Sequence, residues 1–202
     1  SAFCTAYKYA QDRSRTRRVF GSSYFVSEST QNGLRIRHTL YAPEGDDPVL
    51  LDDVEIENLT NTERHPKHFE YFDANRHQLL IQWVRTGVAA TLGDLVRDKS
   101  NDAFLQTTEY DPEQKTLFAS MSPKASVKRP KPDVPSSEDF YPPVLFLSAL
   151  SGHVNATCGD QQTFFGKGTP ALPDAVRTLP PSTQLAPRSA MFQPAALVLR
   201  SD

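Results

Sequence analysis

Apolar and polar residues alternate along much of this chain, and this period of two predicts β-strands with one buried and one solvent-facing side. The order Leu-Arg-Ile-Arg over residues 34–37 is the clearest case. The strand-forming segment Tyr24-Phe25-Val26 precedes it, and Asn32-Gly33 stands between the two. Both residues of that dipeptide tolerate positive φ, as a two-residue hairpin turn requires. We therefore predict a β-hairpin that turns at Asn32-Gly33.

Further strands are predicted at regular intervals, over residues 49–57, 67–72, 88–95, 104–110, 116–121 and 195–199. In the first of these, the apolar phase changes between Leu51 and Val54, which is typical of a β-bulge. Residues 71–83 fit either a helix face or a strand, and we favour a strand because their neighbours are strands. The most apolar run, residues 144–150, predicts a strand in the middle of a sheet.

Long loops are predicted where proline and glycine gather. The 16 prolines of the sequence interrupt helices and inner strands. Residues 122–143 and 171–194 are rich in proline, and residues 159–170 form a glycine-containing loop in this interpretation. Many short strands and hardly a helix indicate an all-β fold of two stacked antiparallel sheets with few short helices. We assign residues 1–20 to a polar lead-in segment or edge strand, and residues 21–202 to one β-sandwich domain of a longer chain.

Charge argues against a nucleic-acid-binding protein. The formal net charge is −2 with both signs mixed along the chain, so a basic field for a phosphate backbone is missing. One short basic run is interrupted by prolines and is interpreted as a solvated loop; it contains Lys124, Lys128, Arg129 and Lys131.

Hydropathy and cysteine content point to a cytoplasmic protein. No stretch approaches the ~18 apolar residues of a membrane span, so no membrane association is expected. The first residues lack the apolar segment of a signal peptide. Cys4 and Cys158 lie far apart, without the spacing of a disulfide framework or a zinc site.

Catalytic and metal-binding motifs are also missing. The sequence has no phosphate-binding loop, zinc-protease helix or serine nucleophile elbow. His65 and His68 stand three apart, and such positions in a strand point to opposite faces, so they do not form a metal site. The adjacent carboxylates Asp52 and Asp53 diverge likewise, which argues against an acid pair for glycoside hydrolysis. We expect no metal, no cofactor and no catalytic residue in this chain.

Two groups of aromatic residues are candidates for sugar contact. Trp83, with Tyr71 nearby in sequence, is a candidate platform for a sugar ring, and packing in the core is the alternative. The segment Phe164-Phe165-Gly166 follows the polar residues 159–162. This mixture is typical of a ligand-contacting loop. The alternative is a hydrophobic plug at one end of the sandwich.

A series of short motifs runs in a fixed order from residue 21 onward. They are Gly21-Ser22-Ser23-Tyr24-Phe25, Asn32-Gly33-Leu34, Asp47-Pro48-Val49, Glu57-Asn58-Leu59-Thr60, Gln82-Trp83, Asn101-Asp102-Ala103-Phe104, Asp160 with Phe164-Phe165-Gly166, Pro170-Ala171-Leu172 and Gln193-Pro194-Ala195-Ala196-Leu197. In this order they resemble the N-terminal domain of the cellobiose/chitobiose phosphorylase-like family. Residues 71–87 and 124–143 depart from that pattern, which leaves the branch of the family and the sugar open.

The resemblance implies a β-supersandwich similar to the galactose mutarotase group, followed by an (α/α) barrel that carries the general acid. It implies a non-catalytic domain of an inverting glycoside phosphorylase, which cleaves β-linked glucosides or oligoglucans with inorganic phosphate as co-substrate. The implied partners are an oligosaccharide or sugar phosphate, the downstream catalytic domain, and a second copy in a homodimer.

The resemblance also implies a position for substrate contact. The family's loop that approaches an active site, commonly that of the dimer partner, matches residues 159–168. By this match, Asp160, Gln161 and Gln162 are expected to form hydrogen bonds near the substrate. Phe164 and Phe165 are expected to pack beside it.

Three other functions remain open from the sequence. A stand-alone carbohydrate-binding module would use Trp83, Tyr71 or Tyr141 as platforms. An epimerase of the mutarotase type would need a histidine and a glutamate that converge on one sheet face; the histidines are His38, His65, His68, His77 and His153. A structural sandwich would bind only other protein domains.

Overall fold

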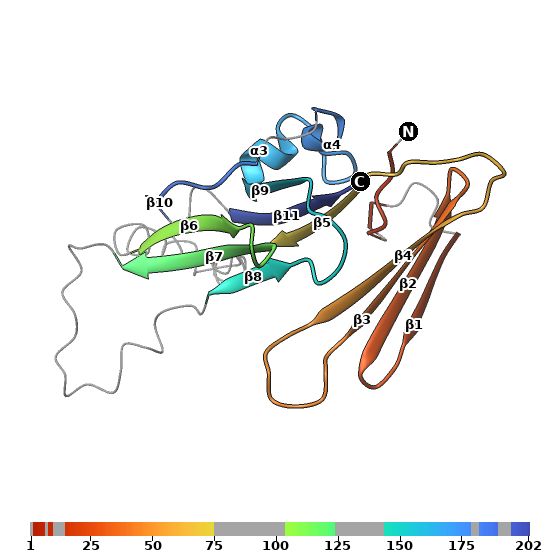
Figure 1. The fold of residues 1–202 in the computed structure, drawn as a ribbon, viewed down its shortest axis with the longest axis horizontal. Helices are drawn as coiled ribbons and strands as arrows, with labels where there is room; N and C mark the ends of the chain where they lie inside the picture. The colour runs from red at the N-terminus through yellow and green to blue at the C-terminus, as the bar shows by residue number, and fades with distance from the viewer. Residues whose placement is uncertain are drawn as a thin grey trace, which may run out of the picture. The chain divides into compact units, whose positions relative to one another are not determined.

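A computed structural model describes residues 2–6, 8–9, 15–74, 104–123, 144–178, 182–189 and 195–202. Strands dominate these residues, and they pair antiparallel in three sheets (Figure 1). This confirms the all-β supersandwich prediction, with three sheets in place of the two expected. The chain divides into two compact units, Ser1–Pro66 with Gly168–Leu172 and Lys67–Lys167 with Pro173–Asp202, each of which is described by itself.

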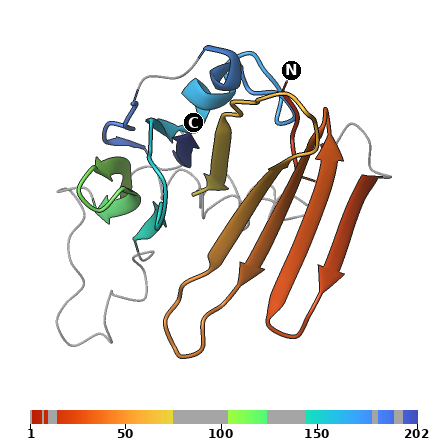
Figure 2. The same ribbon diagram turned by 45° about the vertical axis from the view of Figure 1, so that its right-hand side comes forward.

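The first unit is built on a four-stranded sheet in simple up-and-down order (Figure 2). Its strands are β1 (Thr16–Phe20), β2 (Tyr24–Gln31), β3 (Leu34–Tyr41) and β4 (Leu51–Asn58). The predicted hairpin is confirmed, since β2 and β3 pair around a turn in which Asn32 has φ 54° and Gly33 has φ 76°. Of the first twenty residues, Thr16–Phe20 form β1, which lies at one border of this sheet among the described strands.

Alternate residues of this sheet lie on two chemically different faces. The apolar face includes Ile36, the most buried apolar side chain of the sheet. The charged face carries cross-strand ion pairs, Arg35 with Glu57 and Arg37 with Glu55 at 3.9 Å. The period of two in the sequence therefore corresponds to one packed and one wet face.

The predicted bulge in β4 is wrong. Residues of β3 and β4 pair without a shift from Tyr41 opposite Leu51 to Leu34 opposite Asn58. The phase change in the sequence arises because Asp52 lies on the apolar face of the regular strand. Its carboxylate is paired there with His38.

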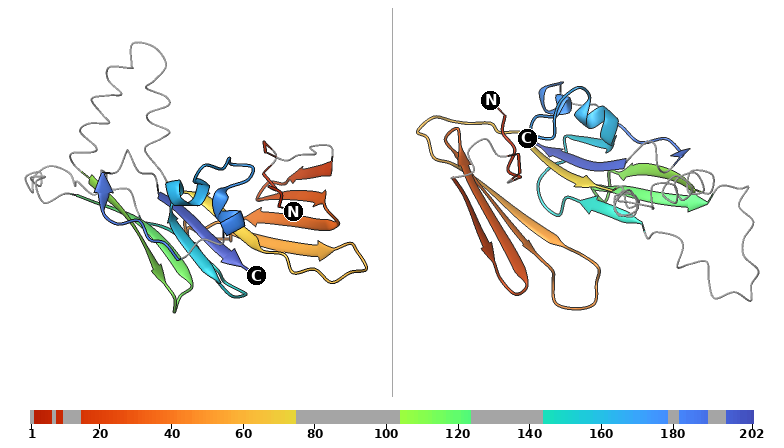
Figure 3. Two further views of the ribbon diagram at one scale, coloured as in Figure 1. Left: turned by 90° about the horizontal axis from the view of Figure 1, so that it is seen from above. Right: turned by 180° about the vertical axis from the view of Figure 1, so that it is seen from behind.

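Among the residues that the structure describes, the second unit has two sheets and two short helices (Figure 3). One sheet has the order β10-β6-β7-β8, with β6 (Phe104–Asp111), β7 (Thr116–Pro123), β8 (Leu145–Ser148) and β10 (Arg188–Ser189). The other has the order β5-β11-β9, with β5 (His68–Asp73), β9 (Ala156–Asp160) and β11 (Ala195–Ser201). The helices are α3 (Gln161–Phe165) and α4 (Asp174–Thr178).

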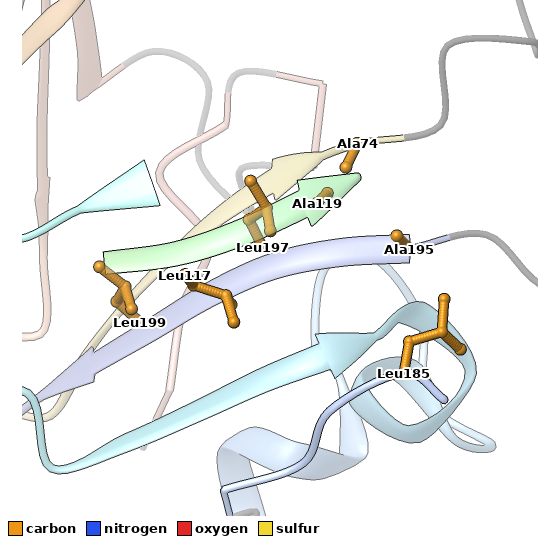
Figure 4. Packing of buried hydrophobic residues seen from close by; sticks show 7 residues of the cluster. All are labelled: Ala74, Leu117, Ala119, Leu185, Ala195, Leu197 and Leu199. Atoms are coloured by element: carbon orange, nitrogen blue, oxygen red, sulfur yellow. The ribbon is translucent and has the colours of Figure 1, made fainter. Parts of the chain in front are cut away.

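β11 is buried on both faces and organises this unit. Leu197 and Leu199 join a core cluster with Leu117 of β7 on one side of the strand (Figure 4). Ala196 and Val198 contact the helices on the other side. The three-stranded sheet therefore forms the middle layer, between the other sheet and the helix pair. Such a layer favours a continuous apolar sequence, as in Ala-Ala-Leu-Val-Leu.

Two expectations for the second unit are wrong. Residues 144–150 are not an inner strand of the described sheet: β8 lies at its end, with Leu145 and Leu147 packed inward and Phe146 50% exposed. Residues 159–170 are not simply a loop, because they begin with the end of β9 and with α3. The fully buried β9 was not predicted at all.

Several predicted segments lie outside the described residues. These are most of the ambiguous stretch 71–83 with Trp83, the weak strand 88–95, and the proline-rich loop from residue 124 to 143. Within the proline-rich stretch 171–194, the structure places α4 and β10.

Candidate functional site

The sequence candidates of the second unit meet at the junction of β9 and α3, which we call the Asp160 corner (Asp160 to Phe165). Asp160 ends the strand with extended backbone angles, and α3 begins at the next residue. Its Oδ1 accepts hydrogen bonds from the backbone N–H groups of Gln162 at 2.8 Å and Thr163 at 3.4 Å. Aspartate is among the best residues for this N-cap, since it satisfies donors that the helix leaves unpaired.

The charge of Asp160 is balanced within the same unit. Its side chain is largely buried, and Oδ2 lies 3.9 Å from an Arg188 Nη1 of β10. The helix ends at Gly166, whose φ of 56° suits a glycine and whose N–H donates to the carbonyl of Gln162. A cap at each end therefore satisfies backbone groups that this single turn of helix would leave unpaired.

Aromatic packing attaches α3 to the three-stranded sheet. Phe164 is 3% exposed and belongs to a core cluster with Cys158 and Val198. Its ring stacks on Tyr71 with the centroids 5.4 Å apart, and Phe165 meets Tyr71 edge-on at 5.2 Å. Such contacts are worth about 0.5–1.5 kcal/mol beyond the buried area.

Tyr71 joins the polar and apolar parts of the corner. Its hydroxyl accepts a hydrogen bond from Gln161 Nε2 at 2.8 Å, while Phe164 occupies one face of its ring. The structure thus brings Tyr71 together with three of the five predicted loop residues, Gln161, Phe164 and Phe165. A sugar-platform role for Tyr71 stays a prediction, and Trp83 lies outside the described residues.

The exposed part of the corner is small and polar. Gln162 and Thr163 are exposed, and Gln161 is half-buried. The carboxamide of Gln162 offers both donors and an acceptor, which is the chemistry that binds sugar hydroxyls. Its backbone is held by the Asp160 cap, so this side chain is presented from a fixed position.

Sequence reasoning gave Cys158 no role in this site, yet it lies beneath the corner. The thiol is fully buried and donates to the backbone carbonyl of Asp160 at 3.3 Å. Burial raises the pKa of the Cys158 thiol, so the group stays neutral. It acts as a small apolar residue, and the alternation of β9 gave no signal because the strand is buried on both faces.

The first unit holds a separate polar network on its apolar face. His38 Nδ1 lies 2.9 Å from Asp52 Oδ2, and Thr5 Oγ1 lies 3.4 Å from His38 Nε2. The predicted divergence of the two aspartates is confirmed, because Asp53 lies on the opposite face. There its carboxylate raises the pKa of Tyr41. The network orients the His38 ring. The sequence alone did not distinguish His38 from the other four histidines as a candidate site residue.

The comparison with protein families decides the identity of the fold. A model described as "Glycosyl hydrolase 94, supersandwich domain" matches residues 2–189. The chain belongs to this family. The match covers both the four-stranded sheet and the Asp160 corner of the supersandwich domain, and it confirms the resemblance seen in the sequence. No curated protein matches the chain. In the part of the supersandwich domain that the structure describes, no helix has the length and apolar character to cross a membrane.

Proposed function

We propose that this supersandwich domain is the non-catalytic N-terminal domain of an inverting glycoside phosphorylase that acts on β-linked glucosides or oligoglucans. The family match over residues 2–189 carries the proposal. In this reaction an oxygen of inorganic phosphate attacks the anomeric carbon, the glycosidic C–O bond breaks, and an acid protonates the leaving oxygen. The downstream (α/α) barrel supplies that acid, and the product is a sugar 1-phosphate of inverted configuration.

The domain contributes one wall of the active site through the Asp160 corner. Gln161 and Gln162 form hydrogen bonds with the oligosaccharide or sugar phosphate. Asp160, Phe164 and Phe165 hold these two side chains in place, which is supported by the N-cap and by the aromatic packing against the sheet. The site belongs to a homodimer in which the corner faces the catalytic domain of the partner subunit.

The test is a phosphate-release assay on the full-length natural protein, with glucose 1-phosphate and a panel of glucose and oligoglucan acceptors. Gln162→Ala should lower kcat/KM about threefold to tenfold, which corresponds to one hydrogen bond of roughly 0.5–1.5 kcal/mol. The change should leave stability unaltered, because the side chain is exposed.

Thr163→Ala is the matched control, since this neighbour is exposed on the same helix. Equal activity of both variants and the unaltered protein would contradict a role of the Asp160 corner in substrate binding. An absence of phosphate release with every acceptor would contradict the phosphorylase itself, and glucan titration by calorimetry would then test a carbohydrate-binding module.

A further inference from the structure

The four-stranded sheet of the first unit has two border strands, β1 and β4 (Figure 2). Within the described residues, β1 pairs with β2 alone and β4 pairs with β3 alone. The outer N–H and C=O groups of a border strand are a template for pairing with another chain. Proteins commonly protect such edges with charge, so the charges on these two strands decide what each can bind.

The two borders carry opposite charge. β1 has Arg17 and Arg18 and no acidic residue. β4 has four carboxylates and no basic residue: Asp52, Asp53, Glu55 and Glu57. Like charges opposite one another destabilise strand pairing, whereas opposite charges stabilise it. Contacts β1–β1 or β4–β4 between two molecules are therefore opposed, and a contact β1–β4 is favoured.

One row of the charged face shows the same complementarity in register. Reading across the sheet, Arg17 of β1 pairs with Glu28, Glu28 with Arg37, and Arg37 with Glu55 of β4. The row alternates in sign over all four strands, beginning with arginine and ending with glutamate. Arg37 and Glu55 form an ion pair at 3.9 Å. An arginine opposite Glu55 would continue this alternation of charge beyond β4. Arg17 in β1 of a second copy supplies such an arginine.

We propose that copies of this chain associate end to end, with β1 of one copy pairing antiparallel to β4 of the next and Arg17 placed opposite Glu55. Antiparallel pairing continues the up-and-down order of the sheet, since β1 and β4 already run in opposite directions. It also keeps the charged faces of the two copies on the same side. The contact joins different surfaces, so repetition gives a ring or an open run of molecules.

The association is expected to be weak and sensitive to salt, because the shared border is five residues long on β1 and both residues of the Arg17–Glu55 pair are exposed. Sedimentation equilibrium of the full-length natural protein is the measurement. The weight-average mass should rise with protein concentration at about 0.05 M salt, and this rise should weaken at about 0.5 M salt, where the Debye length is a few ångströms.

Charge reversal tests the contact itself. Arg17→Glu and Glu55→Arg each place like charges at every β1–β4 contact, so each should weaken association at least about threefold. An equimolar mixture of the two variants restores opposite charges and should associate like the unaltered protein. Glu44→Arg is the control, because it makes the same charge change as Glu55→Arg on an exposed residue of the β3–β4 loop, outside both border strands.

Association that is unchanged in both reversal variants, or a mass that never varies with concentration, would overturn the proposal. A constant dimer mass would contradict this contact but would agree with the homodimer of the proposed function. Phosphorolysis does not depend on the β1–β4 contact. If circular dichroism shows that a reversal variant is unfolded, Arg17→Gln and Glu55→Gln give the same comparison, with a loss in each single variant but no restoration on mixing.

Discussion

The strands β3 and β11 occupy equivalent inner positions in their own sheets, yet they differ in how they are buried. In β3 only Ile36 is buried, at 8% exposure, and charged side chains alternate with apolar ones. In β11 the five residues from Ala195 to Leu199 are all buried, because one face meets a second sheet and the other meets α3 and α4. A sheet covered on one face keeps a period of two in its sequence, whereas a sheet covered on both faces loses it.

The difference also concerns what holds each unit together. The second unit is stabilised by apolar burial on both sides of β11, which contributes about 25 cal/mol for each Å² removed from water. The sheet of the first unit shows exposed ion pairs, which are worth roughly 0–1 kcal/mol each. We therefore expect the second unit to respond much more strongly to the loss of apolar atoms.

The largest effect is expected from truncation in the middle layer. Leu197→Ala removes a side chain with 0% exposure and should lower the free energy of unfolding by about 2–5 kcal/mol, from lost burial and the cavity it leaves. Ile56→Ala in β4, where the side chain is 38% exposed, should cost less than about 1.5 kcal/mol. Urea denaturation followed by circular dichroism measures both, and equal costs would contradict the comparison.

An intermediate effect is expected at the Asp160 corner. Asp160→Ala removes the acceptor for the Gln162 and Thr163 N–H groups and should cost about 0.5–2 kcal/mol. Asp160→Asn keeps a side-chain oxygen that can cap the helix, so it should retain most of the stability. Thermal unfolding of the two variants separates capping from charge. An equal loss in both would assign the effect to the Arg188 contact instead.

The smallest effect concerns the two cysteines, one in each unit. Cys158 is fully buried with a raised pKa, whereas Cys4 is half-buried. A thiol reagent should therefore modify Cys4 in the folded protein and Cys158 only after unfolding. Cys4→Ser should abolish the native reaction; a native reaction that survives in this variant would show that Cys158 is accessible.

The raised pKa of Cys158 also sets the sign of a pH effect. The folded state holds this proton more tightly than the unfolded state, whose pKa is near the ordinary value of 9.0. The stabilisation is therefore complete below that value and is lost as the pH rises above it. Stability above pH 9.0 should fall more steeply in the unaltered protein than in Cys158→Ala, as measured by urea denaturation at several pH values.

The fold could be predicted where local chemistry is decisive. Asn32-Gly33 was recognisable as a hairpin turn because its positive φ values are rare for other residues. Asp160 and Phe164 were recognised as members of one segment, but not as the cap and the anchor of a helix. A five-residue helix is too short to show a period of 3.6, and its stability comes from Tyr71, which lies far away in the sequence.

The sequence by itself determined the all-β class, the alternating strands β2, β3 and β4, and the family motifs, because side-chain period and turn chemistry act between near neighbours. Among the described strands, tertiary structure alone decided that β9 and β11 belong to a middle layer and that β8 lies at the end of its sheet. It also decided that His38 pairs with Asp52, and that Gln161 reaches Tyr71. These features depend on which strands become neighbours and on what covers each face of a sheet. A strand buried on both faces has no alternation of apolar and polar residues, so its sequence does not show its position in the fold.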